Sequence, residues 1–105
     1  MTRALIVLCM LAIGLAGCAT KIIDDKMKTY VGQPASAVIA ALGLPTRQDE
    51  IAGHKVYVWE VTSMYRGTSR NCTIRAILGA GDIVSGYYWQ GNEEGCENYA
   101  MVLGR

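Results

Sequence analysis

The sequence predicts an α+β domain in which two short helices pack on an antiparallel sheet of three or four strands. Between residues 23 and 42 the apolar residues recur at intervals of three and four, which is the repeat of one helix face. From residue 47 onward, short alternating segments are separated by glycine-containing turns, which is typical of antiparallel strands. We expect helices that precede such a meander to cover one face of the sheet.

The first predicted helix covers residues 23–31. Asp24 and Asp25 stand in its first turn, where a helix N-terminus favours negative charge. A metal or acid–base role for this pair is disfavoured, because adjacent helical residues point about 100° apart. The second predicted helix covers residues 34–42. It begins at Pro34, whose missing N–H costs nothing there, and it ends before Gly43, a typical C-terminal residue.

The rest of the chain is predicted to form strands. Residues 47–51 are short and polar, which indicates an edge strand. Residues 55–62 are rich in Val, Tyr and Trp and alternate between two faces. The remaining predicted segments are a polar loop at 63–71, strands at 72–78 and 83–90, a polar turn at 91–95, and a tail at 97–105 that either packs back or frays.

Aromatic residues are concentrated in this β-rich part. The chain has six Tyr, two Trp and no Phe, and all of the aromatic residues except Tyr30 lie beyond residue 55. One alternating set is expected to face the helices as core, and the other set lies on a sheet face without predicted cover. Two interpretations stay open, a core role alone or a core combined with a binding face, since Tyr, Trp and Arg dominate binding hot spots. The candidate surface residues are Tyr57, Trp59, Tyr65, Arg75, Tyr88 and Trp89.

Residues 1–17 have the parts of a signal peptide. Arg3 supplies a positive charge, and an apolar run over residues 4–15 is too short to span a bilayer, which takes about 20 residues. Leu15-Ala16-Gly17-Cys18 resembles the lipobox of bacterial lipoproteins. This resemblance implies cleavage before Cys18, three acyl chains on that residue, and export to the outer membrane because Ala19 follows it. We therefore predict a signal peptide (1–17), a lipidated tether (18–22) and one periplasmic domain (23–105).

The cysteines fit this interpretation. Cys9 leaves with the signal peptide and Cys18 takes the lipid, so Cys72 and Cys96 remain as a pair in an oxidising compartment. We predict a disulfide between them, because a hairpin that turns near residue 80 brings the two together. Closing such a loop stabilises a domain by roughly 3 kcal/mol. That contribution is large for a chain this small.

Charge and chemistry argue against several classes of function. Once Arg3 is removed, nine basic residues face nine acidic ones, so no basic surface suggests nucleic acid as a partner. His54 is the only histidine and lies in a predicted turn, and no local sequence marks a catalytic nucleophile. The cluster of Glu93, Glu94 and Glu97 could bind a cation weakly, although a solvated turn is the favoured interpretation. We expect no enzyme activity, no metal and no cofactor apart from the covalent lipid.

Residues 31–38, 42–46 and 53–59 carry a further resemblance. Val31-Gly32 followed by Val38, then Leu42-Gly43-Leu44-Pro45, then Gly53 followed by Tyr57 and Trp59, resembles the signature of the small outer-membrane lipoproteins of the SmpA/OmlA (BamE-like) group. That fold is similar to one module of the β-lactamase inhibitor protein, with two helices on a small antiparallel sheet. The resemblance implies an accessory subunit of the machinery that inserts β-barrels into the outer membrane.

The sequence therefore predicts a lipid-anchored protein on the periplasmic face of the outer membrane, with a non-enzymatic role in envelope assembly or integrity through an envelope protein partner. The alternative is an inhibitor-like or plasmid-transfer-associated lipoprotein that binds an exported enzyme or a transfer apparatus. The Cys72 and Cys96 pair is not part of the BamE pattern and keeps this alternative open. A small hydrolase or ligand carrier is a third and weaker hypothesis.

Overall fold

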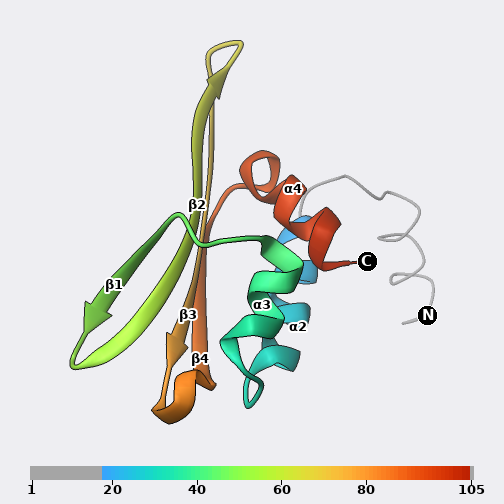
Figure 1. Cartoon of the computed structure of the whole chain (residues 1–105). Coiled ribbons are helices and arrows are strands. Elements are labelled where there is room, and N and C mark those ends of the chain that lie inside the picture. Colours follow the sequence, from blue (N-terminus) through green and yellow to red (C-terminus); the bar gives the residue numbers. More distant parts are fainter. Residues whose placement is uncertain (1–17, 105) are drawn as a thin grey trace, which may run out of the picture.

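The computed structural model describes residues 18–104, and within this range three α-helices lie on one side of a four-stranded antiparallel sheet (Figure 1). The α+β class is therefore confirmed, with one helix more than predicted. The strands follow the order β1-β2-β3-β4, so each pairs with its neighbour in the chain. The predicted signal peptide at 1–17 lies outside the described residues. The elements are α2 (Cys18–Tyr30), α3 (Ala35–Leu42), β1 (Arg47–Ile51), β2 (His54–Tyr65), β3 (Thr68–Leu78), the 3₁₀ helix η1 (Ala80–Asp82), β4 (Val84–Gly91) and α4 (Glu93–Leu103).

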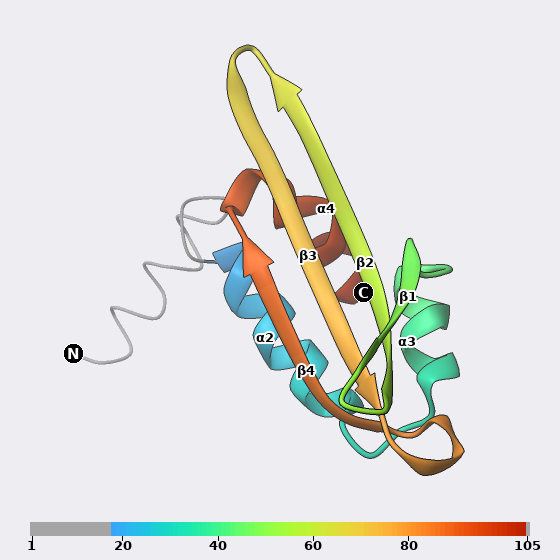
Figure 2. The ribbon, with the colours of Figure 1, turned by 90° about the vertical axis from the view of Figure 1, so that its left-hand side faces the viewer.

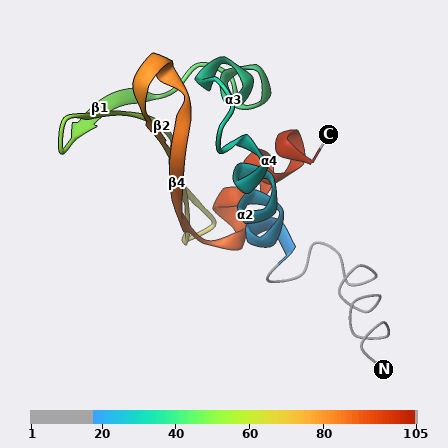
Figure 3. The same ribbon diagram turned by 90° about the horizontal axis from the view of Figure 1, so that it is seen from below.

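The hydrophobic core lies between the helices and the sheet face that they cover (Figure 3). Trp59 of β2 is its largest fully buried side chain, with 1% exposure. The indole Nε1 of Trp59 donates a hydrogen bond to the carbonyl oxygen of Gly43 at 2.8 Å, so the polar edge of the ring is satisfied inside the core. Other fully buried members are Ile23, Met27, Val38, Ile74, Leu78 and Val84.

Helix α2 is longer than predicted. Residues 18–22 are helical rather than a tether, and Cys18 is only 8% exposed. The predicted face is present, since Ile23 and Met27 are fully buried. Glu93 at the start of α4 accepts hydrogen bonds from the Ala19 backbone N–H at 3.1 Å and the Thr20 hydroxyl at 2.6 Å. This contact between residues more than seventy positions apart holds the start of α2, and no local pattern could have indicated it.

Asp24 has a different role from the predicted one. Because α2 is already helical at Cys18, Asp24 does not lie in its first turn. Its Oδ1 accepts hydrogen bonds from the Tyr87 hydroxyl at 2.8 Å and from Trp89 Nε1 at 3.3 Å. These two hydrogen bonds, of which the one from Tyr87 has the larger effect, lower the pKa of Asp24. The same carboxylate raises the pKa of Tyr87. Asp24 therefore fastens α2 to β4.

Helix α3 agrees closely with its prediction. It spans Ala35–Leu42, with Pro34 as the residue before its first turn. Gly43 ends it at a φ of 86°, and the Gly43 N–H donates to the carbonyl oxygen of Ile39 at 2.7 Å. Glycine adopts this positive φ without the strain that a side chain brings.

The hairpin of β2 and β3 is much longer than predicted (Figure 2), because the segment 63–71 is not a loop. Pairing continues out to Tyr65 and Thr68. Arg66 and Gly67 close the hairpin with φ values of 50° and 78°, the positive values that match the twist of paired strands. Side chains on both faces of this extension are largely exposed, so no buried face imposes an alternating pattern on the sequence.

Helix α4 (Glu93–Leu103) occupies most of the segment predicted as a turn at 91–95 and a tail at 97–105, and this tail packs back on the core. The Asn92 side chain accepts a hydrogen bond from the Gly95 N–H at 2.8 Å, which is the contact of a helix N-cap. A Cβ at Gly95 would overlap the backbone of Asn71, so this glycine allows α4 to pack directly on β3. Asn and Gly also dominate turns, and for this reason the segment has the composition of a turn.

A disulfide joins Cys72 and Cys96, as predicted, with their Cα atoms 4.9 Å apart. Both residues are fully buried. Cys96 lies in α4, whereas the sequence placed it between a polar turn and the C-terminal tail. The bridge therefore fastens α4 to the centre of the sheet.

Candidate interaction surface

The six residues predicted to form a binding surface lie in three places. Trp59 is buried in the core, so its assignment to the surface is wrong. Tyr57 and Trp89 also face the helices and are partly buried against the core. Arg75 and Tyr88 lie on the opposite face of the sheet, and Tyr65 lies at the end of the β2–β3 hairpin. The structure thus separates the aromatic residues into a core set and two exposed groups.

The first exposed group lies on the sheet face without a helix, which we call the uncovered face. Strand β1 extends on this side, away from the helices (Figures 1 and 3). Val58 is fully buried although none of the described helices covers this face, and its cross-strand neighbours are the long residues Arg47 and Arg75. The residues that define the uncovered face are Arg47, Asp49, Glu60, Thr73, Arg75 and Tyr88.

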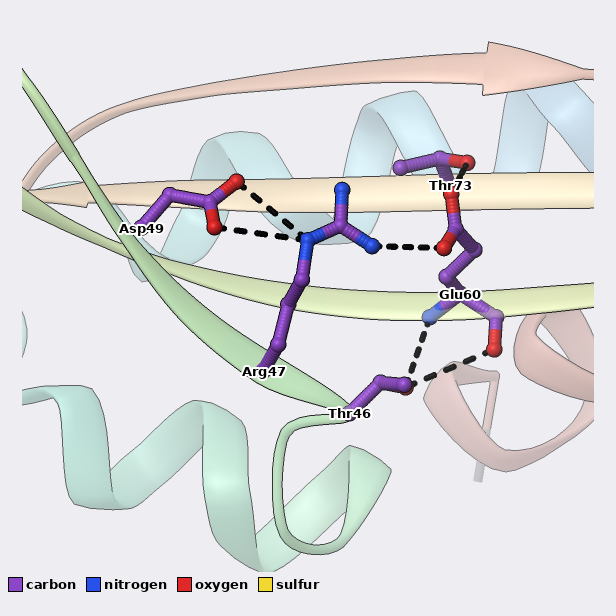
Figure 4. A network of polar contacts seen from close by, with 5 residues as sticks. All are labelled: Thr46, Arg47, Asp49, Glu60 and Thr73. Carbon is purple, nitrogen blue, oxygen red and sulfur yellow. Dashed lines mark hydrogen bonds and ion pairs between the residues drawn. The ribbon is translucent and has the colours of Figure 1, made fainter.

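Glu60 is the centre of a polar network on this face (Figure 4). Arg47 Nη1 lies 2.6 Å from Glu60 Oε1, and Arg47 Nε lies 3.3 Å from the Asp49 carboxylate. The Thr73 hydroxyl donates to Glu60 Oε2 at 3.2 Å. The Glu60 backbone N–H donates to Thr46 Oγ1 at 3.0 Å. Side chain and backbone of Glu60 are therefore both held in place.

The charges in this network reinforce one another. The hydrogen bond from Arg47 is the main reason that the pKa of Glu60 lies below its usual value. The same bond raises the pKa of Arg47. Neither Glu60 nor Arg47 was predicted as a site residue. Glu60 lies within the apolar segment of β2, and a charged residue in such a segment indicates that it has a partner. The identity of that partner depended on the register between β1 and β2, which was not predicted.

Tyr88 and Arg75 extend the uncovered face toward β4. The Arg75 guanidinium carbon lies 5.8 Å from the centroid of the Tyr88 ring, within the range of a cation–π contact. Tyr88 is 53% exposed, and its hydroxyl donates to Gln90 Oε1 at 3.0 Å. An exposed tyrosine held beside an arginine has the composition of a protein-binding hot spot.

The second exposed group lies at the end of the β2–β3 hairpin. The guanidinium carbons of Arg66 and Arg70 lie 5.4 Å and 4.7 Å from the centroid of the Tyr65 ring. Tyr65 is 52% exposed and Met64 is 68% exposed. Arg70 was missed from the sequence, because the predicted loop gave no reason to place it beside Tyr65.

The start of α2 forms a third region of interest. A hollow of about 520 Å³ lies beside it, between the first turns of α2 and α4. Glu93, one of its lining residues, already binds the start of α2 through Ala19 and Thr20. Within the acidic cluster, Glu93 therefore has a structural role.

The described residues carry few features of a catalytic or metal centre. His54 is exposed at the start of β2. Across residues 18–104, no three His, Cys, Asp or Glu side chains are grouped closely enough to hold a metal ion. None of the helices in this range has the length and apolar character needed to cross a membrane. The expectation that the protein is not an enzyme stays a prediction.

Comparison of the chain with protein-family models, with curated proteins and with solved structures finds no match.

Proposed function

We propose that this protein is a lipid-anchored lipoprotein on the periplasmic face of the outer membrane, and that it binds another envelope protein without acting as an enzyme. The lipobox resemblance at Leu15-Ala16-Gly17-Cys18 supports the anchor, and Ala19 supports the outer membrane as its destination. The buried Cys72–Cys96 disulfide agrees with an oxidising compartment.

The uncovered face is the observation that carries the binding role. Glu60 and Arg47 hold each other in position, and Tyr88 is presented beside Arg75. Side chains that are ordered before binding lose little conformational entropy when a partner docks. This pre-organised mixture of aromatic and charged groups suits a protein partner better than a small-molecule substrate.

We further propose that the fold belongs with the SmpA/OmlA (BamE-like) group, with an accessory role in envelope assembly or integrity. Helices on one face of a short antiparallel meander are the arrangement that this resemblance implies. The disulfide, which is not part of the BamE pattern, favours a second candidate: an inhibitor-like or plasmid-transfer-associated lipoprotein that binds an exported enzyme or a transfer apparatus.

The anchor is tested by labelling cells with a palmitate analogue and separating their membranes. Cys18→Ser should abolish labelling and release the protein from the membrane fraction. Cys9→Ser is the matched control, because the same change in the predicted signal peptide leaves the lipidation site intact. Labelling that survives in the Cys18 variant would refute the anchor.

The binding face is tested with a photocrosslinking amino acid at position 88 in living cells. Met101 of α4, which is 56% exposed, provides the control position on the helix side of the molecule. We expect a crosslinked partner from position 88 and none from position 101. Recovery of barrel-assembly subunits supports the accessory role, and recovery of an exported enzyme or a transfer protein supports the second candidate. Crosslinks from position 101 alone would contradict the proposed face.

A further inference from the structure

We propose that the end of the β2–β3 hairpin is a second membrane contact, in which Tyr65, Arg66 and Arg70 bind the phosphate-bearing surface of the bilayer that holds the lipid anchor. This inference rests on the proposed lipidation of Cys18. It concerns a surface distinct from the uncovered face.

The hairpin end lies at the anchored end of the molecule. Cys72 of β3 pairs with Gly91, the last residue of β4, and Glu93 two residues later binds the start of α2. The start of α2 therefore lies level with the Cys72 end of the sheet. From Val61, the partner of Cys72, the hairpin continues for four residues to Tyr65. At about 3.3 Å per residue, these four residues carry the hairpin end roughly 13 Å beyond the level of Cys72. Figures 1 and 2 show the hairpin extending past the start of α4.

Hydrogen bonds and the disulfide join the base of the hairpin to the start of α4. Asn92 Nδ2 donates to the Ser69 carbonyl oxygen at 2.8 Å, and the Asn92 N–H donates to the Asn71 carbonyl oxygen at 3.0 Å. The disulfide of Cys72 fastens the base of the same strand to α4. Because the first turn of α4 contacts both α2 and the hairpin, an anchor at Cys18 sets the direction in which the hairpin projects.

The chemistry of the hairpin end matches a phospholipid surface. Two arginine guanidinium groups lie within cation–π distance of the Tyr65 ring, and the sequence has no Asp or Glu from residue 61 to residue 81. Arginine binds phosphate through paired hydrogen bonds. Tyrosine is enriched at the level of the headgroups, where an apolar ring with a polar edge is stable. Met64, 68% exposed, adds an apolar side chain at the same end of the hairpin.

The lipid anchor favours the membrane over a soluble acidic protein as the partner of the hairpin end. A surface already tethered by lipid meets the bilayer at high effective concentration, so weak contacts suffice for docking. Each arginine near an anionic surface changes the ratio of docked to undocked protein by about five-fold. Multiplying the two contributions gives a loss of up to about 25-fold when both arginines are removed.

The test uses the full lipidated protein carrying Tyr65→Trp in vesicles of phosphatidylethanolamine and phosphatidylglycerol at a ratio of about three to one. Brominated acyl chains quench tryptophan close to the bilayer, and the unsubstituted protein measures the background from Trp59 and Trp89. We expect extra quenching from position 65. Adding Arg66→Gln and Arg70→Gln should remove most of it, whereas replacement of both arginines by Lys should keep most of it.

Controls keep the two proposals distinguishable. Lys26→Gln with Lys28→Gln removes the same charge from an exposed part of α2 and should leave the quenching at position 65 unchanged. Mass spectrometry of each sample reports the lipid on Cys18. A sample without lipid refutes the anchor. A lipidated sample with no extra quenching at position 65, or with quenching that the glutamine pair leaves unchanged, refutes the membrane contact. Crosslinking of the hairpin end to an acidic protein without extra quenching also overturns it.

Discussion

Breaking the Cys72–Cys96 bridge tests how this small domain is stabilised. The two cysteines are 24 positions apart. In the chain-entropy model, closing a loop of that size removes freedom from the unfolded chain worth about 3.5 kcal/mol. A domain of this length has a total unfolding free energy of about 4–13 kcal/mol. The bridge therefore supplies at least about a quarter of the stability.

The measurement is thermal unfolding of the protein in neutral detergent, followed by circular dichroism with and without a thiol reductant. A loss of about 3.5 kcal/mol should lower the midpoint by roughly 14–28 °C, at about 4–8 °C per kcal/mol for a domain of this size. The Cys72→Ala/Cys96→Ala double variant should unfold near the temperature of the reduced protein. Reductant should not shift the double variant further, which controls for other effects of the reagent.

A shift that corresponds to less than about 1 kcal/mol would refute the loop-closure reasoning. It would mean that the unfolded chain is already compact around these two residues, or that α4 holds its place without the bridge. Amide exchange of α4 separates these explanations. Fast exchange only after reduction indicates that the bridge holds the helix on β3.

Three further changes test the packing described above. Gly95→Ala forces α4 away from Asn71 and should lower the free energy of unfolding in urea by about 1–3 kcal/mol; an unchanged midpoint would contradict the close approach. Trp59→Ala should lower it by about 3–5 kcal/mol, and Trp59→Phe, which loses the bond to Gly43, should lower it less. Folding lowers the pKa of Asp24 below its usual value of 3.8. Its ionised carboxylate therefore contributes to stability at pH values above 3.8. This contribution is lost as the pH falls through the lower pKa of the folded protein. Asp24→Asn should therefore reduce the difference in stability between pH 7 and pH 2; an undiminished difference would exclude this carboxylate as a source of the acid dependence.

Local signals predicted those elements whose ends are set by nearby residues. Helix α3 lies between Pro34 and Gly43, and both residues act through their own backbone. The apolar face of α2 was predicted for the same reason, since Ile23 and Met27 repeat at helical spacing and are buried. The disulfide followed from which cysteines remained once the lipobox was assigned. The helix that holds Cys96 was not predicted, because its sequence has the composition of a turn and a tail.

Long-range contacts explain the remaining errors. Helix α4 depends on an approach between Gly95 and Asn71 that only the folded chain creates. The outer part of the β2–β3 hairpin has no buried face, so its composition is that of a loop. On the uncovered face, Arg75 and Tyr88 were predicted as candidates. The link between Arg47 and Glu60 was not, because it needs the register of two strands.

The helical start of α2 limits how far this protein can reach. A flexible linker after an anchor lets a domain explore a volume set by the length of the linker. Here the chain is helical from Cys18, and Glu93 fixes the next two residues. If Cys18 carries the lipid, the domain stays within its own longest dimension, 44 Å, of the bilayer. A partner must then come to the membrane surface to be bound, and it meets the domain in a restricted range of orientations.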